Sequence, residues 1–189
     1  QAYVFPILCP ICGSEVSQES NDSTVRCTGG IKCSAQAVEK IRHFVSRKAF
    51  NIEGFGKRLV EQFFLNGWIK KPSDIFCLEK NFGSSSKVKI KDFDGWGDQS
   101  AKKLFQSINN RRVVSLSRMI YSLGIRHVGE QASILLAKHH GSWSNFYKNI
   151  IAAKDKKSQE WHELALIDGI GNMTASSLVD YFSSDEGVW

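Results

Sequence analysis

The 189-residue sequence has no long apolar run, since no stretch approaches the ~18 apolar residues of a membrane-spanning helix. Residues 1–11 also lack the charged segment and the cleavage pattern of a secretory signal peptide. We therefore expect a cytoplasmic protein with no membrane partner. In that reducing compartment the five cysteines, an odd number, are not expected to form disulfides. A chain of this length does not need disulfides to hold a core.

The net charge favours one class of partner. The chain carries a formal charge of +6 and has an isoelectric point near 9.1. A basic balance suits a polyanion such as nucleic acid, although basic solvated surfaces are common in proteins of every class. The net charge alone therefore does not identify a nucleic-acid partner, and sequence motifs must support that interpretation.

A pattern of an acidic residue followed by Gly-x-Gly occurs three times. The copies are Ile52-Glu53-Gly54-Phe55-Gly56, Phe93-Asp94-Gly95-Trp96-Gly97 and Ile167-Asp168-Gly169-Ile170-Gly171. Small or apolar residues recur at positions +4, +7 and +8 after each second glycine, as on one face of a helix. These residues are Val60, Phe63, Phe64, Ala101, Leu104, Phe105, Ala175, Leu178 and Val179. Each turn is therefore expected to open a helix.

A fourth, degenerate copy is expected in the second half of the chain. Aligning Ala132, Leu135 and Leu136 with the helical stripe puts Arg126-His127-Val128 at the Gly-x-Gly position, with Gly129 one residue later. The sequence thus predicts four tight turns.

Such turns are suited to anions. Two glycines let the backbone approach a ligand and adopt positive φ, and the following helix exposes its first N–H groups at the positive end of its dipole. The phosphate loop of dinucleotide-binding folds is a rival interpretation, but Leu59, Ser100 and Thr174 replace its third glycine. We therefore interpret the turns as helix-hairpin-helix units that grip a nucleic-acid backbone, with a plain interhelical connector as the alternative for any single copy.

The expected DNA-binding residues are the turn residues and the basic residues near them. They are Gly54, Gly56, Lys57, Gly95, Gly97, Lys102, Arg126, His127, Gly129, Gly169 and Gly171.

Four cysteines have the spacing of a zinc site. Cys9 and Cys12 offer two thiolates from one tight turn, and Cys27 and Cys33, a wider pair than usual, would close a tetrahedron. Between the pairs, residues 15–17 and 24–26 are expected to form a short β-hairpin around a polar turn at 21–23. A segment this small has almost no core, so the metal must supply much of its folding energy. Four protein thiolates leave no open position for catalysis.

The predicted fold class is mainly α. A small four-cysteine finger with a β-hairpin, residues 9–34, precedes a helical domain of four helix-hairpin-helix motifs, residues 35–189, with motif pairs at about 35–112 and 113–183. Helical spacing and end signals predict helices at 35–45, 57–65, from 73 or 74, 98–109, 116–123 and 173–182, and one that carries residues 132–136 and stops around 139–141.

Three further features are expected to have no binding role. Cys77 lies in an apolar run and is interpreted as a small buried thiol. Residues 81–89, rich in Gly, Ser and Lys, are interpreted as a solvated linker in preference to a basic loop that touches phosphate. His139 and His140 are interpreted as a helix end, because no third metal ligand stands near them.

Taken together, the cysteine spacing, the turn at 52–56 and the stretch Gly124-Ile125-Arg126-His127-Val128-Gly129-Glu130 resemble the bacterial NAD-dependent DNA ligases over essentially the whole chain. In that family an adenylation domain and an OB-fold precede the four-cysteine zinc finger and four helix-hairpin-helix motifs, and a BRCT domain follows. The resemblance implies that this chain is the finger and helix-hairpin-helix portion of such an enzyme, with residues 1–8 as the end of the OB-fold.

The resemblance also implies a function. The family enzyme seals 5′-phosphate/3′-hydroxyl nicks during replication and repair, with NAD and Mg as cofactors, after adenylating a lysine in a Lys-x-Asp-Gly motif. The closest segment here, Lys91-Asp92-Phe93-Asp94-Gly95, has one residue too many and lies in a hairpin. We therefore expect no catalytic residue in this chain, and no ligation by it alone. We expect one structural zinc, nicked duplex DNA as partner, a monomer, and a place at the bacterial nucleoid.

One departure and one alternative remain open. The last hairpin has Asn172 where such motifs often have proline, and no basic residue follows it, so its grip on phosphate is expected to be the weakest. The alternative function is a stand-alone zinc-knuckle and helix-hairpin-helix module that recruits a repair or recombination nuclease. A Lys-x-Asp-Gly motif upstream in the gene would favour the ligase.

Overall fold

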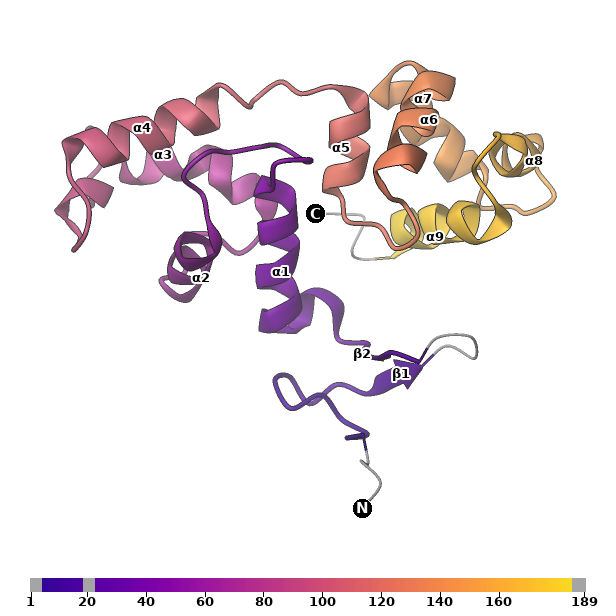
Figure 1. Cartoon of the computed structure of the whole chain (residues 1–189), viewed down its shortest axis with the longest axis horizontal. Helices are drawn as coiled ribbons and strands as arrows, with labels where there is room; N and C mark the ends of the chain where they lie inside the picture. The colour runs from indigo at the N-terminus through magenta and orange to yellow at the C-terminus, as the bar shows by residue number, and fades with distance from the viewer. Residues whose placement is uncertain (1–4, 19–22, 185–189) are drawn as a thin grey trace.

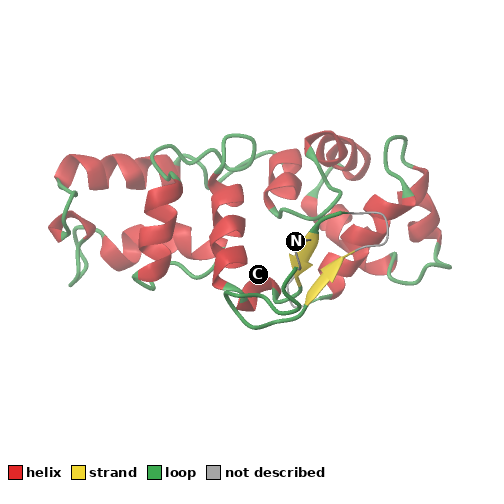
Figure 2. Cartoon of the chain, turned by 60° about the horizontal axis from the view of Figure 1, so that its bottom comes forward, coloured by secondary structure: helices red, strands yellow, loops and turns green. Residues whose placement is uncertain are grey.

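The structure is a computed structural model that describes residues 5–18 and 23–184. Its described part contains a two-stranded sheet and nine α-helices, which confirms the mainly α fold. Helices α2 to α4 lie at one end of the molecule and α6 to α9 at the other, α1 and α5 lie near the middle, and the strands lie below α1 (Figure 1). Figure 2 shows the strands coming forward from the helical body.

The bounds of these elements follow. They are β1 Val16–Gln18, β2 Val25–Cys27, α1 Ser34–Val45, α2 Lys57–Leu65, α3 Leu78–Phe82, α4 Asp98–Asn109, α5 Leu116–Ser122, α6 Glu130–His140, α7 Trp143–Ala152, α8 Gln159–Leu166 and α9 Asn172–Ser183, with short 3-10 helices at Gly30–Lys32, Pro72–Cys77 and Ile90–Asp92.

The hairpin of the finger forms within one residue of its expected position. Strands β1 and β2 are antiparallel, with Val16 opposite Cys27. Part of the expected polar turn, residues 21–22, lies outside the described residues. Leu8 forms an isolated antiparallel bridge with Glu15, so it pairs with the finger. The assignment of residues 1–8 to a preceding domain stays a prediction, and residues 1–4 are not described.

The first half of the helical body is built on an aromatic core. Phe63 of α2 is fully buried, and its ring centroid lies 5.5 Å from Phe55, 4.8 Å from Trp68 and 5.8 Å from Trp96. Phe55 and Trp96 are the central residues of two Gly-x-Gly turns, so both turns insert a ring against the same helix. Burying such a side chain contributes roughly 1.5–3 kcal/mol. The glycine turns are therefore fixed by the core.

The second half has its own core. Leu136, Phe146, Ile150 and Leu178 have no exposed surface and come from α6, α7 and α9. Ile170, the central residue of the last Gly-x-Gly turn, is buried with them. The division into two clusters of buried residues fits two hairpin pairs, while the domain boundaries stay a prediction.

Helices α7 and α8 were not anticipated from the sequence. The Ser142 hydroxyl accepts the N–H of Asn145 at the start of α7, and the Ser158 hydroxyl accepts that of Trp161 at the start of α8. Buried Phe146 then follows the first of these caps within four residues. A serine before helically spaced apolar residues is a known signal for the start of a helix, so the sequence contained the information needed to predict both helices.

The expectation that Cys77 is buried is wrong. The helix expected from residue 73 or 74 is the 3-10 helix Pro72–Cys77, which leads directly into α3. Residues three apart share a face of a 3-10 helix. Ile75 and Leu78 take the inner face and are fully buried, so Cys77 is left exposed. The run of apolar residues in the sequence suggests that all of them are buried, but the winding of the helix directs Cys77 towards solvent.

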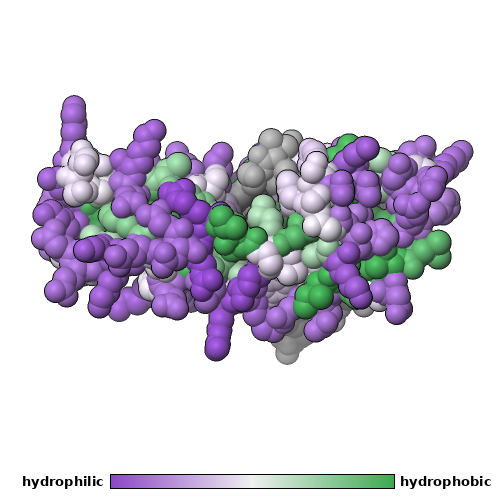
Figure 3. Space-filling view, turned by 90° about the horizontal axis from the view of Figure 1, so that it is seen from above, coloured by the Kyte–Doolittle hydropathy of each residue, from purple (hydrophilic) through white to green (hydrophobic). Residues whose placement is uncertain are grey.

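None of the helices in the described part of the chain is long and apolar enough to cross a membrane. Seen from above, the surface is mainly hydrophilic, with small apolar patches (Figure 3).

His140 ends α6, as expected, and it is a buried titratable group. Its side chain is 6% exposed, and its Nδ1 lies 3.3 Å from the Asn149 side-chain nitrogen. Its Nε2 has no hydrogen-bond partner among the described residues. Burial, with a smaller contribution from the charge of His139, lowers the pKa of His140 to about 4.

Acid should therefore destabilise the second half. Above pH ~6.5 the ring is neutral in both states. As the pH is lowered from 6.5 to about 4, His140 takes up a proton in the unfolded chain but not in the folded chain. The free energy of unfolding should therefore decrease as the pH is lowered through this range, by at most about 3 kcal/mol. Denaturant titrations at several pH values would measure this. His140→Gln should flatten the profile over that window, and exposed His139→Gln should not; equal profiles for parent and His140→Gln would contradict a buried neutral ring.

Candidate zinc centre and nucleic-acid interface

The structure brings the four cysteines of the finger together. Their sulfur atoms all lie within 4.8 Å of one another. Cys9 and Cys33 are buried, and Cys12 and Cys27 are partly buried. The knuckle between Cys9 and Cys12 is closed by the Gly13 N–H, which donates to the Cys9 carbonyl over 2.8 Å. Four sulfur donors at this separation suit a tetrahedral zinc ion, and they form the one such group found among the described residues.

The surroundings of Cys12 and Cys27 shift the pKa values of the two thiols in opposite directions. Hydrogen bonds from the side chain and backbone of Ser14 lower the pKa of the Cys12 thiol to about 6. The Gly29 N–H donates to the Cys27 sulfur over 3.2 Å and lowers the pKa of that thiol, but burial and the hydrogen bonds with Cys12 and Cys9 outweigh this and raise the pKa of Cys27 to about 11. A Cβ atom at Gly29 would lie 2.7 Å from the Ser14 hydroxyl and 2.9 Å from the Cys12 sulfur, so a larger residue there would displace one of these groups. Metal-binding thiols must lose their protons, and the positive charge of a zinc ion would favour the thiolate form at all four sulfurs.

The second cysteine pair ties the finger to the helical body. Cys33 is the N-cap residue of α1, and its carbonyl accepts the N–H of Ala37 over 2.9 Å. Gln36, also in α1, donates to the carbonyl of Cys27 over 3.0 Å. A metal held by Cys27 and Cys33 would therefore fix the finger against the start of α1.

The helical body contains four tight turns of one geometry, which we number in chain order as turns 1 to 4: residues 52–56, 93–97, 125–129 and 167–171. In each turn the central apolar residue donates its N–H to the carbonyl three residues earlier, over 3.3, 3.0, 3.1 and 2.8 Å respectively. The residue before it has positive φ in every case. These residues are Gly54 at +79°, Gly95 at +81°, His127 at +61° and Gly169 at +80°.

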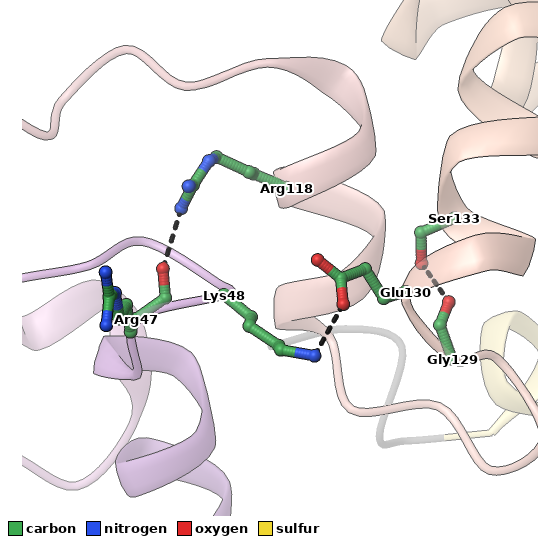
Figure 4. Close-up of polar contacts among 6 residues, drawn as sticks. All are labelled: Arg47, Lys48, Arg118, Gly129, Glu130 and Ser133. Atoms are coloured by element: carbon green, nitrogen blue, oxygen red, sulfur yellow. Dashed lines mark hydrogen bonds and ion pairs between the residues drawn. The ribbon is translucent and has the colours of Figure 1, made fainter.

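The register expected for turn 3 is wrong by one residue. His127 takes the conformation of the first glycine, Val128 is the buried central residue, and Gly129 matches the second glycine. The residue four beyond Gly129 is therefore Ser133, which is buried and bonds back to the Gly129 carbonyl (Figure 4). Matching Ala132 to the apolar stripe assumed that this position must be apolar. A small serine whose hydroxyl is satisfied within the helix fills it equally well.

The second glycines lie at the helix N-termini, but not in the conformation expected. They are the N-cap residues of α2, α4, α6 and α9, namely Gly56, Gly97, Gly129 and Gly171, and all four have negative φ. Within each turn, positive φ is thus needed only at the position of the first glycine, which His127 occupies in turn 3. A Cβ atom on any of the second glycines would meet no atom within 4 Å. Their surroundings are open, so an anion can reach the unpaired N–H groups of each helix.

The basic residues that are expected to bind DNA differ in their exposure and in their position relative to the turns. Lys57 is 62% exposed and lies 3.8 Å from Glu61, one helical turn on. Lys102 is exposed on α4. Arg126 is half-buried and takes the place in turn 3 that Glu53 and its acidic counterparts hold in the other turns. That a basic residue replaces the acidic one in turn 3 was not recognised from the sequence, because this turn was aligned one residue out of register with the others.

The two halves meet where the segment before turn 1 contacts α5. Arg118 of α5 donates to the carbonyls of Arg47 and Ala49, over 3.0 and 2.6 Å. Lys48, between them, reaches across to Glu130 at the start of α6, with 2.6 Å between nitrogen and oxygen (Figure 4). None of these contacts, which join residues about 70 to 80 positions apart, was expected from the sequence.

Comparison with known proteins agrees with this arrangement. Residues 9–35 match the model of the NAD-dependent DNA ligase C4 zinc finger domain, and residues 118–187 match that of the helix-hairpin-helix motif. A DNA ligase of Roseobacter denitrificans is 49% identical over 94% of this chain, and one of Parvibaculum lavamentivorans is 49% identical over 96%. The chain thus contains a match to the zinc finger domain of NAD-dependent DNA ligases and is similar to DNA ligases over nearly its whole length. It spans about a quarter of the length of these relatives, 25% and 26%.

These similarities bear on the expectations from sequence. The resemblance to NAD-dependent DNA ligases is confirmed, as is structural zinc as the metal of the finger domain. No match favours a stand-alone module that recruits a nuclease. The helix-hairpin-helix match covers turns 3 and 4, and the shared geometry extends the same interpretation to turns 1 and 2.

Proposed function

We propose that this chain is the DNA-binding part of an NAD-dependent DNA ligase, which seals 5′-phosphate/3′-hydroxyl nicks in duplex DNA. The observation that carries the proposal is the set of four equivalent turns, each of which leaves a helix N-terminus open to a phosphate. Contacts of this kind hold the backbone and read no sequence. The binding groups are the turn residues Gly54, Gly56, Gly95, Gly97, His127, Gly129, Gly169 and Gly171, assisted by Lys57, Lys102 and Arg126.

The finger has a structural part in this proposal. We propose that Cys9, Cys12, Cys27 and Cys33 hold one zinc ion, with the finger at residues 9–34 and the helix-hairpin-helix domain at 35–189. The metal supplies folding energy and no chemistry, because four thiolates fill its coordination sphere. Catalysis belongs to other parts of the enzyme, where NAD and Mg are used. The proposed partner is nicked duplex DNA, bound by a monomer at the nucleoid in the cytoplasm.

The isolated chain should bind duplex DNA with strong salt dependence and join no nick. Each phosphate neutralised should lower log K by about 0.9 per decade of salt, and permuting the sequence should change affinity little. Fluorescence anisotropy with nicked and intact duplexes, from low to physiological salt, would measure both effects. A ligation assay with NAD and Mg, with a complete relative as positive control, should yield product from the control alone. Salt-insensitive or sequence-restricted binding would count against the turns as phosphate sites, and ligation by this chain would overturn the domain assignment.

A further inference from the structure

Two of the four turns open a helix with an acidic residue that is already ion-paired. Asp98 is the first residue of α4, and its carboxylate lies 2.9 Å from the Lys91 ammonium. Glu130 is the first residue of α6, and its carboxylate lies 2.6 Å from Lys48. Turns 1 and 4 open instead with Lys57 and Asn172.

Each ion pair places a negative group where the proposed function needs a phosphate. A carboxylate at the first helical position lies beside the unpaired N–H groups and interacts with the same dipole as a bound anion. It therefore repels a phosphate that approaches the same helix end. Asp98 is 83% exposed and Glu130 is 45% exposed, so both carboxylates face solvent, from which DNA would arrive.

The lysines are positioned so that they can change partners. The carbonyls on both sides of Lys48 are held by Arg118, so its backbone is fixed while its ammonium, 62% exposed, reaches over Glu130 (Figure 4). Lys91 lies in the short 3-10 helix just before turn 2. Hydrogen bonding to Glu130 and to Asp98 raises the pKa of Lys48 and of Lys91 respectively, so both stay charged at neutral pH.

We propose that Asp98 and Glu130 are built-in counterions, which DNA phosphates replace as the partners of Lys91 and Lys48. This inference rests on the proposed function, because it concerns how the same turns bind phosphate. In the free protein the carboxylates satisfy the lysines, and in the complex the lysines turn to the DNA backbone. Because each ion pair must break before its lysine meets a phosphate, DNA binding is weaker than it would be with the same lysines unpaired.

The test removes one counterion at a time. Glu130→Gln and Asp98→Asn keep the shape of the side chain and free the lysine, so each should tighten binding to a nicked duplex by about two- to fivefold, the effect of one charge at a helix terminus. Each should also steepen the slope of log K against log salt by up to about 0.9, because the carboxylate that is set free in the parent complex takes up a cation from solution, which offsets one released from the DNA, and the neutral amide takes up none. The matched control is Asp155→Asn, in the loop between α7 and α8, where the side-chain oxygen can still accept the Lys157 N–H.

The control should change affinity by less than either variant, because screening limits the effect of distant charges at physiological salt. Thermal melts of all variants would show whether the fold is kept. If Glu130→Gln and Asp98→Asn bind no more tightly than the parent, with unchanged salt slopes, the counterion inference is wrong while the proposed function stands. If the parent itself does not bind duplex DNA, the proposed function fails first, so the two failures are distinguishable.

Discussion

Replacing Cys27 by serine should abolish zinc binding and unfold the finger, while the helical body keeps its structure. The four sulfurs lie within 4.8 Å of one another, and few buried side chains other than the cysteines hold the finger together. Structural zinc contributes roughly 10–16 kcal/mol in small finger domains, so losing one thiolate removes most of the energy that folds this segment. Metal analysis should fall from one zinc per chain to near zero, and hydrogen exchange should rise up to about residue 34.

Cys77→Ser is the matched control for this variant. Cys77 is exposed and lies outside the cysteine cluster, so its replacement should leave the zinc content at one per chain. The helices should give nearly the same circular dichroism in both variants, because the two cores are built from residues of the helical body. A folded, unchelated parent that carried no zinc, or a Cys27→Ser protein that kept a full equivalent, would refute the assignment.

Gly97→Val should weaken DNA binding by about ten- to hundredfold, the effect of losing one hydrogen-bonded contact to a charged group. Gly97 has negative φ, and a Cβ atom there would meet no atom of the protein. The valine would therefore stand in open space at the start of α4, where a phosphate must approach. Stability should fall by only about 1 kcal/mol, because valine is a poorer N-cap than glycine. Thermal melts and binding isotherms at matched salt would separate the two effects.

Two variants of the same motif act as controls. Leu104→Ala, on the buried face of α4, should cost roughly 2–5 kcal/mol of stability through a cavity, and it should affect DNA binding through unfolding alone. Gly95→Val should also destabilise the turn, because Gly95 has a φ of +81° that a β-branched residue resists. If Gly97→Val melts near the parent and binds DNA equally well, turn 2 is a connector and not a phosphate site.

Local chemistry accounts for what could be predicted. A Cys-x2-Cys-Gly knuckle, a Gly-x-Gly turn before an apolar stripe, and the Asn66-Gly67 pair that follows Leu65 act within a few residues, so they can be recognised without knowledge of the fold. Helix α2 begins and ends as expected, at Lys57 and Leu65, and α4 spans Asp98–Asn109 as expected. The family resemblance came from the same local features.

The sequence by itself determined the four cysteines that meet, the four turns that open helices, and the apolar residues that the first, second and fourth of those helices bury. Only the tertiary structure decided the register of turn 3, where His127 replaces a glycine at positive φ because Val128 fills the core. It also decided the exposure of Cys77 and the contacts of Arg118 and Lys48 across the two halves. These features depend on which surface each residue meets after the chain has folded, and no pattern within a few residues carries that information.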